Sequence, residues 1–80
     1  MKREEVFAKV QKIIAEGLGK AVEDIKESSA FETDLGADSL DAIELFCSLE
    51  DEFGLTIADE DAMELKTVGA VVSYICEHIA

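Results

Sequence analysis

The chain has 80 residues, a net charge of −12, and no proline or tryptophan. These properties limit the folds and functions that it can have. A chain of this length buries only about 60% of the surface that it exposes when unfolded, so we expect one domain, residues 1–80, around one modest core. Hydrophobic residues make up 49% of the sequence, which excludes a chain disordered by composition. No apolar run approaches the roughly 20 residues that a membrane-spanning helix needs.

The charge is unevenly distributed along the chain. Residues 27–80 contain fourteen acidic side chains and one basic side chain, Lys66. Such a region repels nucleic acids and anionic lipids, whose binding depends on Lys and Arg, and it attracts basic protein surfaces. The sequence turns acidic at Glu4 and lacks the apolar stretch of a secretory signal. We therefore expect a cytoplasmic protein, and we expect it to be a monomer.

The first third of the chain predicts a helix followed by a long loop. An amphipathic helix is expected over residues 3–16, with Gly17 and Gly19 as stop signals. Residues 17–38 predict a loop that packs its own apolar side chains onto the core, and loops of this length are usually functional. The apolar residues at helical spacing are Val6, Val10, Ile13, Ile14 and Leu18.

A second helix is expected to begin at the Asp38-Ser39 pair and to end at Gly54. Either Asp38 or Ser39 can cap it, and Asp41 adds a favourable charge to the first turn. One broad arc of this helix is apolar and contains Ala42, Ile43, Leu45, Phe46, Leu49 and Phe53. The opposite arc contains Asp41, Glu44, Ser48, Asp51 and Glu52.

The remaining residues predict one short helix and one longer helix. The short helix falls at about residues 59–63, and Thr67 can cap a last helix with a single apolar stripe. That stripe consists of Val68, Val71, Val72, Ile75 and Ile79. Three amphipathic helices and one short helix that share a core predict an all-α fold, a small bundle.

Residues 34–41 read DLGADSLD and lie directly before the acidic helix. This segment, with the IELF stretch that follows, resembles the acyl carrier protein family and specifically its bacterial fatty-acid-synthesis branch. The resemblance continues through residues 49–53, 57–62 and 67–75 and covers essentially the whole chain. It implies the acyl-carrier-protein-like helical fold and a carrier protein that is not an enzyme.

The resemblance implies that Ser39 carries 4'-phosphopantetheine, attached by a phosphopantetheinyl transferase with coenzyme A as donor. The thiol of that arm would hold a fatty acyl chain as a thioester. A serine at a helix start suits this role, because a phosphodiester there lies beside free backbone N–H groups. The alternative is that Ser39 only caps the helix. A hydrolase nucleophile is disfavoured because the one histidine, His78, lies far along the sequence in the expected last helical turn.

The acidic arc of the second helix has two interpretations. It is either an ordinary solvated face or, as the resemblance implies, a docking surface for basic patches on fatty-acid-synthesis enzymes and on the transferase. Like charges at helical neighbour positions cost about 0.2–0.5 kcal/mol per pair, which favours a use for them. The docking residues expected are Asp38, Leu40, Asp41, Glu44, Glu50, Asp51 and Glu52.

The apolar residues have a similar double interpretation, as plain core or as a pocket for the acyl chain. The positions that match the family's pocket are Phe31, Leu45, Phe46, Cys47, Ala62, Leu65 and Val71. Two departures from the family pattern bear on it. Ala58 stands where a proline often precedes the short helix, and Cys47 stands where methionine or another apolar residue is usual.

Three further possibilities are a disulfide, a calcium site and a carrier role in another pathway. Cys47 and Cys76 are expected to be buried free thiols, because a disulfide is unusual in a reducing cytosol. A calcium sensor is disfavoured, because neither residues 34–45 nor 59–66 have the ligand spacing of an EF-hand loop; we expect no metal site. A carrier for polyketide, peptide or D-alanyl transfer keeps the fold and changes only the pathway.

Overall fold

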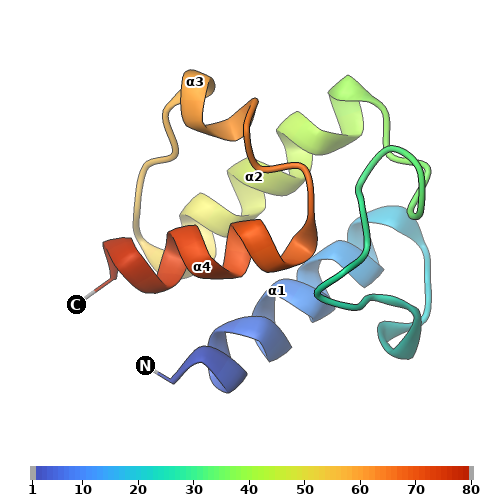
Figure 1. The fold of residues 1–80 in the computed structure, drawn as a ribbon, viewed down its shortest axis with the longest axis horizontal. Helices are drawn as coiled ribbons and strands as arrows, with labels where there is room; N and C mark the ends of the chain where they lie inside the picture. The colour runs from blue at the N-terminus through green and yellow to red at the C-terminus, as the bar shows by residue number, and fades with distance from the viewer. Residues whose placement is uncertain (1, 80) are drawn as a thin grey trace.

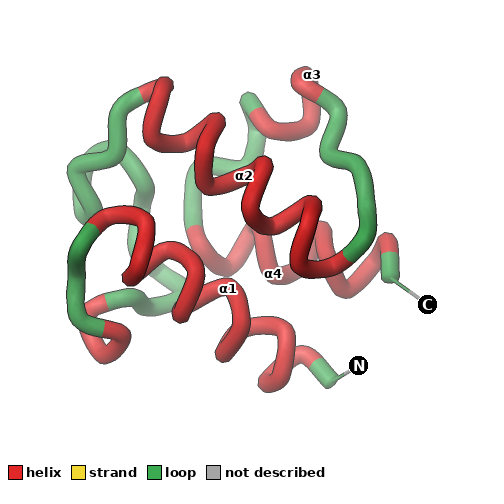
Figure 2. Tube along the Cα trace, turned by 180° about the vertical axis from the view of Figure 1, so that it is seen from behind, coloured by secondary structure: helices red, strands yellow, loops and turns green. Residues whose placement is uncertain are grey.

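The computed structural model describes residues 2–79 and is a bundle of α-helices within that range. Figure 1 shows α1 along one side and α3 on the opposite side, with α2 and α4 between them, and Figure 2 shows the same order from behind. The predicted all-α class is therefore confirmed. The elements are α1 (Arg3–Leu18), a 3₁₀ turn η1 (Val22–Asp24), α2 (Ser39–Phe53), α3 (Asp59–Ala62) and α4 (Val68–His78).

Helix α1 runs two residues beyond its predicted end. Gly17 is helical, and the stop is made by Gly19, which adopts the left-handed conformation with φ 66° and whose N–H donates to the Ala15 carbonyl. Glycine reaches this conformation without the Cβ penalty that other residues incur. The 3₁₀ turn η1 within the long loop was not predicted.

Helix α2 begins and ends where the sequence predicts. Asp38 is the N-cap residue, and its carboxylate accepts a hydrogen bond from the Asp41 amide at 2.9 Å. The Asp41 carboxylate reaches back to the Asp38 amide at 3.4 Å, which completes a capping box. At the other end Gly54 closes the helix with φ 65°.

The core lies where α1, α2 and α4 meet. Leu45 and Leu49 are the buried residues of α2. Leu45 lies directly over Gly17, since a Cβ built on that glycine would come within 2.6 Å of the Leu45 Cδ2. The glycine thus lets α2 approach α1 closely at this level. The other helical residues of the core are Val6, Val10, Ile14, Ala15, Val68, Val71, Val72 and Ile75.

The long loop is fixed by backbone hydrogen bonds to the start of α4. The Phe31 amide donates to the Lys66 carbonyl at 3.0 Å, and the Val68 amide donates to the Ser29 carbonyl at 3.0 Å. The Gly69 amide donates to the Glu27 carbonyl at 2.8 Å, and the Thr67 hydroxyl caps α4 by accepting from Ala70. Since these bonds satisfy amides that a helix start leaves free, the loop and α4 stabilise each other.

Two residues of α2 that the sequence analysis places on its apolar arc or among its buried residues are exposed. Ile43 keeps 59% of its surface accessible, and Cys47 is exposed as well. Each lies two positions from Leu45, which places it on roughly the opposite side of an α-helix. The expectation of a buried Cys47 thiol was therefore wrong, whereas Cys76 is half-buried against the core.

This arrangement predicts very different effects for two truncations on the same helix. Leu49→Ala should lower the free energy of unfolding by about 2–5 kcal/mol, because it leaves a cavity at a site with no exposed surface. Ile43→Ala is the matched control and should change it by no more than about 0.5 kcal/mol. Denaturant unfolding measures both, and equal losses would contradict this placement of α2.

Candidate functional site

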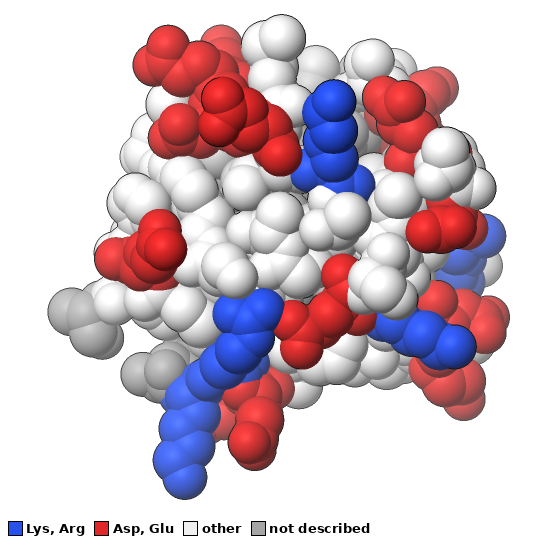
Figure 3. All heavy atoms as spheres, in the orientation of Figure 1, with Lys and Arg blue, Asp and Glu red and all other residues white. Residues whose placement is uncertain are grey.

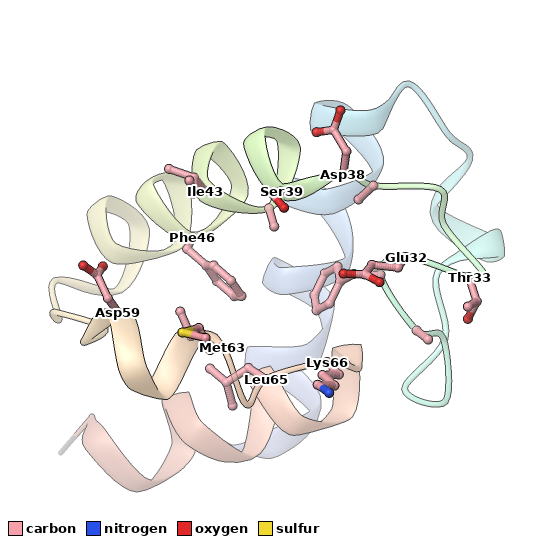
Figure 4. Close-up of a pocket in the computed structure, with 15 residues that line it drawn as sticks. Glu32, Thr33, Asp38, Ser39, Ile43, Phe46, Asp59, Met63, Leu65 and Lys66 are labelled. Atoms are coloured by element: carbon pink, nitrogen blue, oxygen red, sulfur yellow. The ribbon is translucent and has the colours of Figure 1, made fainter.

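A cavity of about 680 Å³ opens between α2, α3 and the segments that precede α2 and α4. Helix α2 provides one wall and α3 the opposite wall (Figure 4). Most of the lining is apolar, and polar groups occur at the rim. The lining residues are Ala30, Phe31, Glu32, Thr33, Ala37, Asp38, Ser39, Ala42, Ile43, Phe46, Asp59, Ala62, Met63, Leu65 and Lys66.

Ser39 is the first residue of α2 and lies at the mouth of this cavity. Its side chain is exposed and points towards the space between α2 and the opposite wall (Figure 4). The capping box engages the amides of Asp38 and Asp41, so by helix geometry the amides of Ser39 and Leu40 are the first-turn N–H groups that remain free. The site therefore offers an accessible hydroxyl beside two free N–H donors.

These surroundings fit a phosphodiester on Ser39 followed by an apolar chain. The free amides and the helix N-terminus favour a negative charge at this point. The carboxylates of Asp38 and Asp41 oppose it, but their oxygens are already drawn towards the cap amides. A cavity of this volume and apolar character is of the size that binds small organic ligands.

The helical phase of α2 decides which of its residues face the cavity. Ala42, Ile43 and Phe46 follow Ser39 by three, four and seven positions, which is the spacing of a single helix face. Leu45 falls outside that spacing and packs in the core instead. The Phe46 ring also contacts Phe31 edge-on, with centroids 6.0 Å apart.

Four of the seven predicted pocket residues line the cavity: Phe31, Phe46, Ala62 and Leu65. Leu45 and Val71 are buried in the core cluster, and Cys47 is exposed away from the lining. The sequence interpretation missed Ala42, Ile43 and Met63. Spacing from Ser39 could have identified the first two, whereas Met63, 77% exposed, has no comparable signal.

The predicted docking residues differ in how free their carboxylates are. Glu50 accepts a hydrogen bond from the Ile57 amide at 2.8 Å, so it holds the loop after α2. Glu52 pairs with Lys9 of α1 at 3.3 Å. Glu44 and Asp51 are exposed, and no ion pair within residues 2–79 involves them. The charges available for docking on α2 are thus fewer than its sequence suggests.

Acidic groups nevertheless gather around the cavity. Figure 3 shows them over α3 and near the start of α2, with a basic side chain and uncharged surface between them. Leu40, 65% exposed, lies beside Ser39 and adds an apolar contact at the predicted docking surface. Together these features make a mainly acidic rim, interrupted by Lys66, around an apolar opening.

A cluster of polar side chains connects α3 to α4. The Tyr74 hydroxyl lies 3.0 Å from an Asp61 carboxylate oxygen and donates to it, and the His78 ring stacks on the Tyr74 ring at 4.0 Å between centroids. Burial of the phenol and the hydrogen bond to Asp61 raise the pKa of Tyr74 above its usual value of 10.0. Tyr74 is therefore protonated at neutral pH and available as a donor.

Neither a metal-binding cluster nor a membrane-spanning helix occurs within residues 2–79. No group of three or more His, Cys, Asp or Glu side chains there is arranged to hold a metal ion. No helix in that range is long and apolar enough to cross a membrane.

Comparison with known proteins agrees with this site. Residues 8–75 match the family model described as "Phosphopantetheine attachment site". An acyl carrier protein of Exiguobacterium sp. (strain AT1b) is 51% identical over 94% of this chain and 95% of its own. That of Exiguobacterium sibiricum is 52% identical with the same coverage.

A solved structure shows the same fold. The acyl carrier protein from Enterococcus faecalis superposes with a TM-score of 0.80 at 44% identity, covering 96% of this chain and 98% of that one. The chain belongs to the phosphopantetheine-attachment family and, within it, to the acyl carrier proteins.

This membership confirms the predicted resemblance, the acyl-carrier role, and phosphopantetheine as the prosthetic group. It makes the chain a carrier and not a catalyst. When bound, the group supplies a thiol at the end of a flexible arm, and the chain's own residues offer the Ser39 hydroxyl and the cavity as candidates for holding it.

The crowded acidic groups around the site predict a response to cations. Magnesium and calcium should raise the melting temperature alike, with a shallow, millimolar dependence, because they relieve repulsion without a built coordination site. Thermal melts across a titration of each ion, with sodium chloride at matched ionic strength as control, measure this. A sharp rise of the melting temperature at micromolar calcium, without the same rise in magnesium, would instead support the calcium-sensor alternative.

Proposed function

We propose that this chain is one carrier domain that holds a growing fatty acyl chain as a thioester on 4'-phosphopantetheine at Ser39 and shuttles it among the enzymes of fatty acid synthesis. The observation that carries the proposal is the position of Ser39. Its exposed hydroxyl lies at the capped start of α2 and at the mouth of the apolar cavity. A cytoplasmic location follows from this role, because the partner enzymes would be met there.

Attachment requires that the Ser39 oxygen reach the donor's phosphorus. In the transfer, the Ser39 Oγ forms the new phosphorus–oxygen bond, the pyrophosphate bond of coenzyme A breaks with release of adenosine 3',5'-bisphosphate, and the hydroxyl proton passes to a base. The chain's one histidine, His78, ends α4, and the Asp38 and Asp41 carboxylates beside Ser39 are engaged in the capping box. We therefore assign the base to the transferase, which agrees with a carrier that is a substrate and not an enzyme.

Docking would use the exposed charges that remain free. Glu44 and Asp51 on α2 extend the acidic rim away from Ser39, and Asp38 and Asp41 flank it. Contacts between exposed charges form quickly, are weak and weaken with salt. These properties suit a carrier that must leave one enzyme before it meets the next.

The first test of the proposal is modification of Ser39. Incubation with coenzyme A and a broad-specificity phosphopantetheinyl transferase should increase the intact mass by one phosphopantetheine group, and Ser39→Ala should abolish the increase. Ser48→Ala, which removes another exposed serine from the same helix, should be modified normally. A wild-type chain that stays unmodified while a control carrier is converted would contradict the assignment.

The second test concerns the docking surface. Glu44→Lys should weaken binding to a synthase of fatty acid synthesis at least about tenfold at low salt, because it reverses a free charge of the proposed contact. Glu77→Lys on α4 makes the same change in net charge outside α2 and should have a smaller effect. Binding is measured across a salt series. Equal binding by Glu44→Lys and wild type at low salt would leave this face as ordinary solvated surface.

A further inference from the structure

The two walls of the cavity are attached to the rest of the molecule very differently. Helix α2 is anchored by Leu45 and Leu49, both buried in the core. Helix α3, wholly within the described part of the chain, has four residues and none is buried. Its N-cap position is Ala58, whose side chain cannot accept a hydrogen bond. Helix α3 therefore has little packing or capping of its own to hold it in place.

One side-chain hydrogen bond ties α3 to the rest of the fold. Among the side-chain hydrogen bonds formed within residues 2–79, only that from Tyr74 to Asp61 reaches α3. Tyr74 of α4 thus faces the carboxylate of the third residue of α3.

The Tyr74 ring is itself held firmly. It projects from α4, whose neighbouring residue Ile75 is fully buried, and it stacks on His78. The loop before α3 has a separate anchor, the hydrogen bond from the Ile57 amide to Glu50. The hydrogen bond from Tyr74 to Asp61 therefore connects α4, which is fixed in the core, to α3, the weakly held wall of the cavity.

We propose that Tyr74 is a positioning residue that sets the location of α3, and with it the opening of the cavity, by holding the Asp61 carboxylate. Asp59, Ala62 and Met63 line the cavity from α3 and the residue after it. If the tie is lost, these side chains are free to move away from Phe46 while α2 stays in place. Tyr74 is not among the residues that line the cavity, so it acts through α3.

The direct test uses the unmodified chain and Tyr74→Phe, which removes the hydroxyl and keeps the ring that stacks on His78. The amides of Ala62 and Met63, which donate to Ala58 and Asp59, should exchange with solvent roughly threefold to tenfold faster, as the loss of one net hydrogen bond predicts. Amides in the middle of α1 and α2 should keep their wild-type rates. NMR-detected hydrogen exchange measures each amide separately.

Two variants of α3 serve as comparison. Asp61→Ala should reproduce the effect of Tyr74→Phe, and the double variant should exchange no faster than either single one, because both remove the same bond. Glu60→Ala removes an exposed charge from the same helix and should leave the exchange rates unchanged. Unchanged exchange in Tyr74→Phe, or equal acceleration in all helices, would overturn the proposal.

A second readout rests on the proposed function. An octanoyl thioester on the arm should be cleaved by hydroxylamine several-fold faster in Tyr74→Phe than in wild type, while an acetyl thioester, too short to depend on the cavity, should be cleaved equally in both. If wild type releases the octanoyl and acetyl groups at the same rate, the cavity does not shelter an acyl chain and that part of the proposed function is contradicted. The hydrogen-exchange experiment then still decides the role of Tyr74. If wild type protects the octanoyl thioester and Tyr74→Phe protects it equally well, the positioning role of Tyr74 is contradicted and the acyl pocket is not.

Discussion

The contact of Leu45 and Leu49 with α1 determines how α2 is rotated about its axis, and the site depends on that rotation. Gly17 allows the Leu45 side chain to lie directly on α1. With Leu45 and Leu49 turned inwards, the face that contains Ser39, Ala42 and Phe46 is directed into the cavity. The Ser39 hydroxyl and the apolar lining thus share one face because another face of the same helix is buried.

Electrostatics and local structure compete along the same helix. The capping box at Asp38 and Asp41 uses two carboxylates to satisfy backbone amides, and Glu50 and Glu52 are engaged by the Ile57 amide and by Lys9. Carboxylates bound in this way are less available to a partner. The proposed docking surface therefore has fewer available carboxylates than the charge of −12 suggests. Glu44 and Asp51 are exposed and form no ion pair within residues 2–79.

The cavity combines a rigid wall with a weakly held one. A helix with buried leucines opens only when the core opens, whereas a short helix without buried side chains can move at a much smaller free-energy cost. A carrier must both cover an acyl chain and release it, and a cavity with one adjustable wall permits both. Ala58 contributes to this balance, because as the N-cap residue of α3 it offers no side-chain capping hydrogen bond.

The sequence by itself determined the helices, their caps and the candidate serine, since each depends on residues within about four positions: Asp38 with Asp41, Thr67 with Ala70, and the residues around Ser39. Only the tertiary structure decided which apolar side chains face the cavity. The apolar arc of α2 is wider than the face that α1 can cover, so Leu45 became core while Ile43 stayed exposed, and Cys47, on the same side as Ile43, is exposed as well. The hydrogen bonds between residues 27–31 and 66–69, and from Tyr74 to Asp61, join segments far apart in the chain. No local pattern specifies such pairings, because they exist only once the helices have packed.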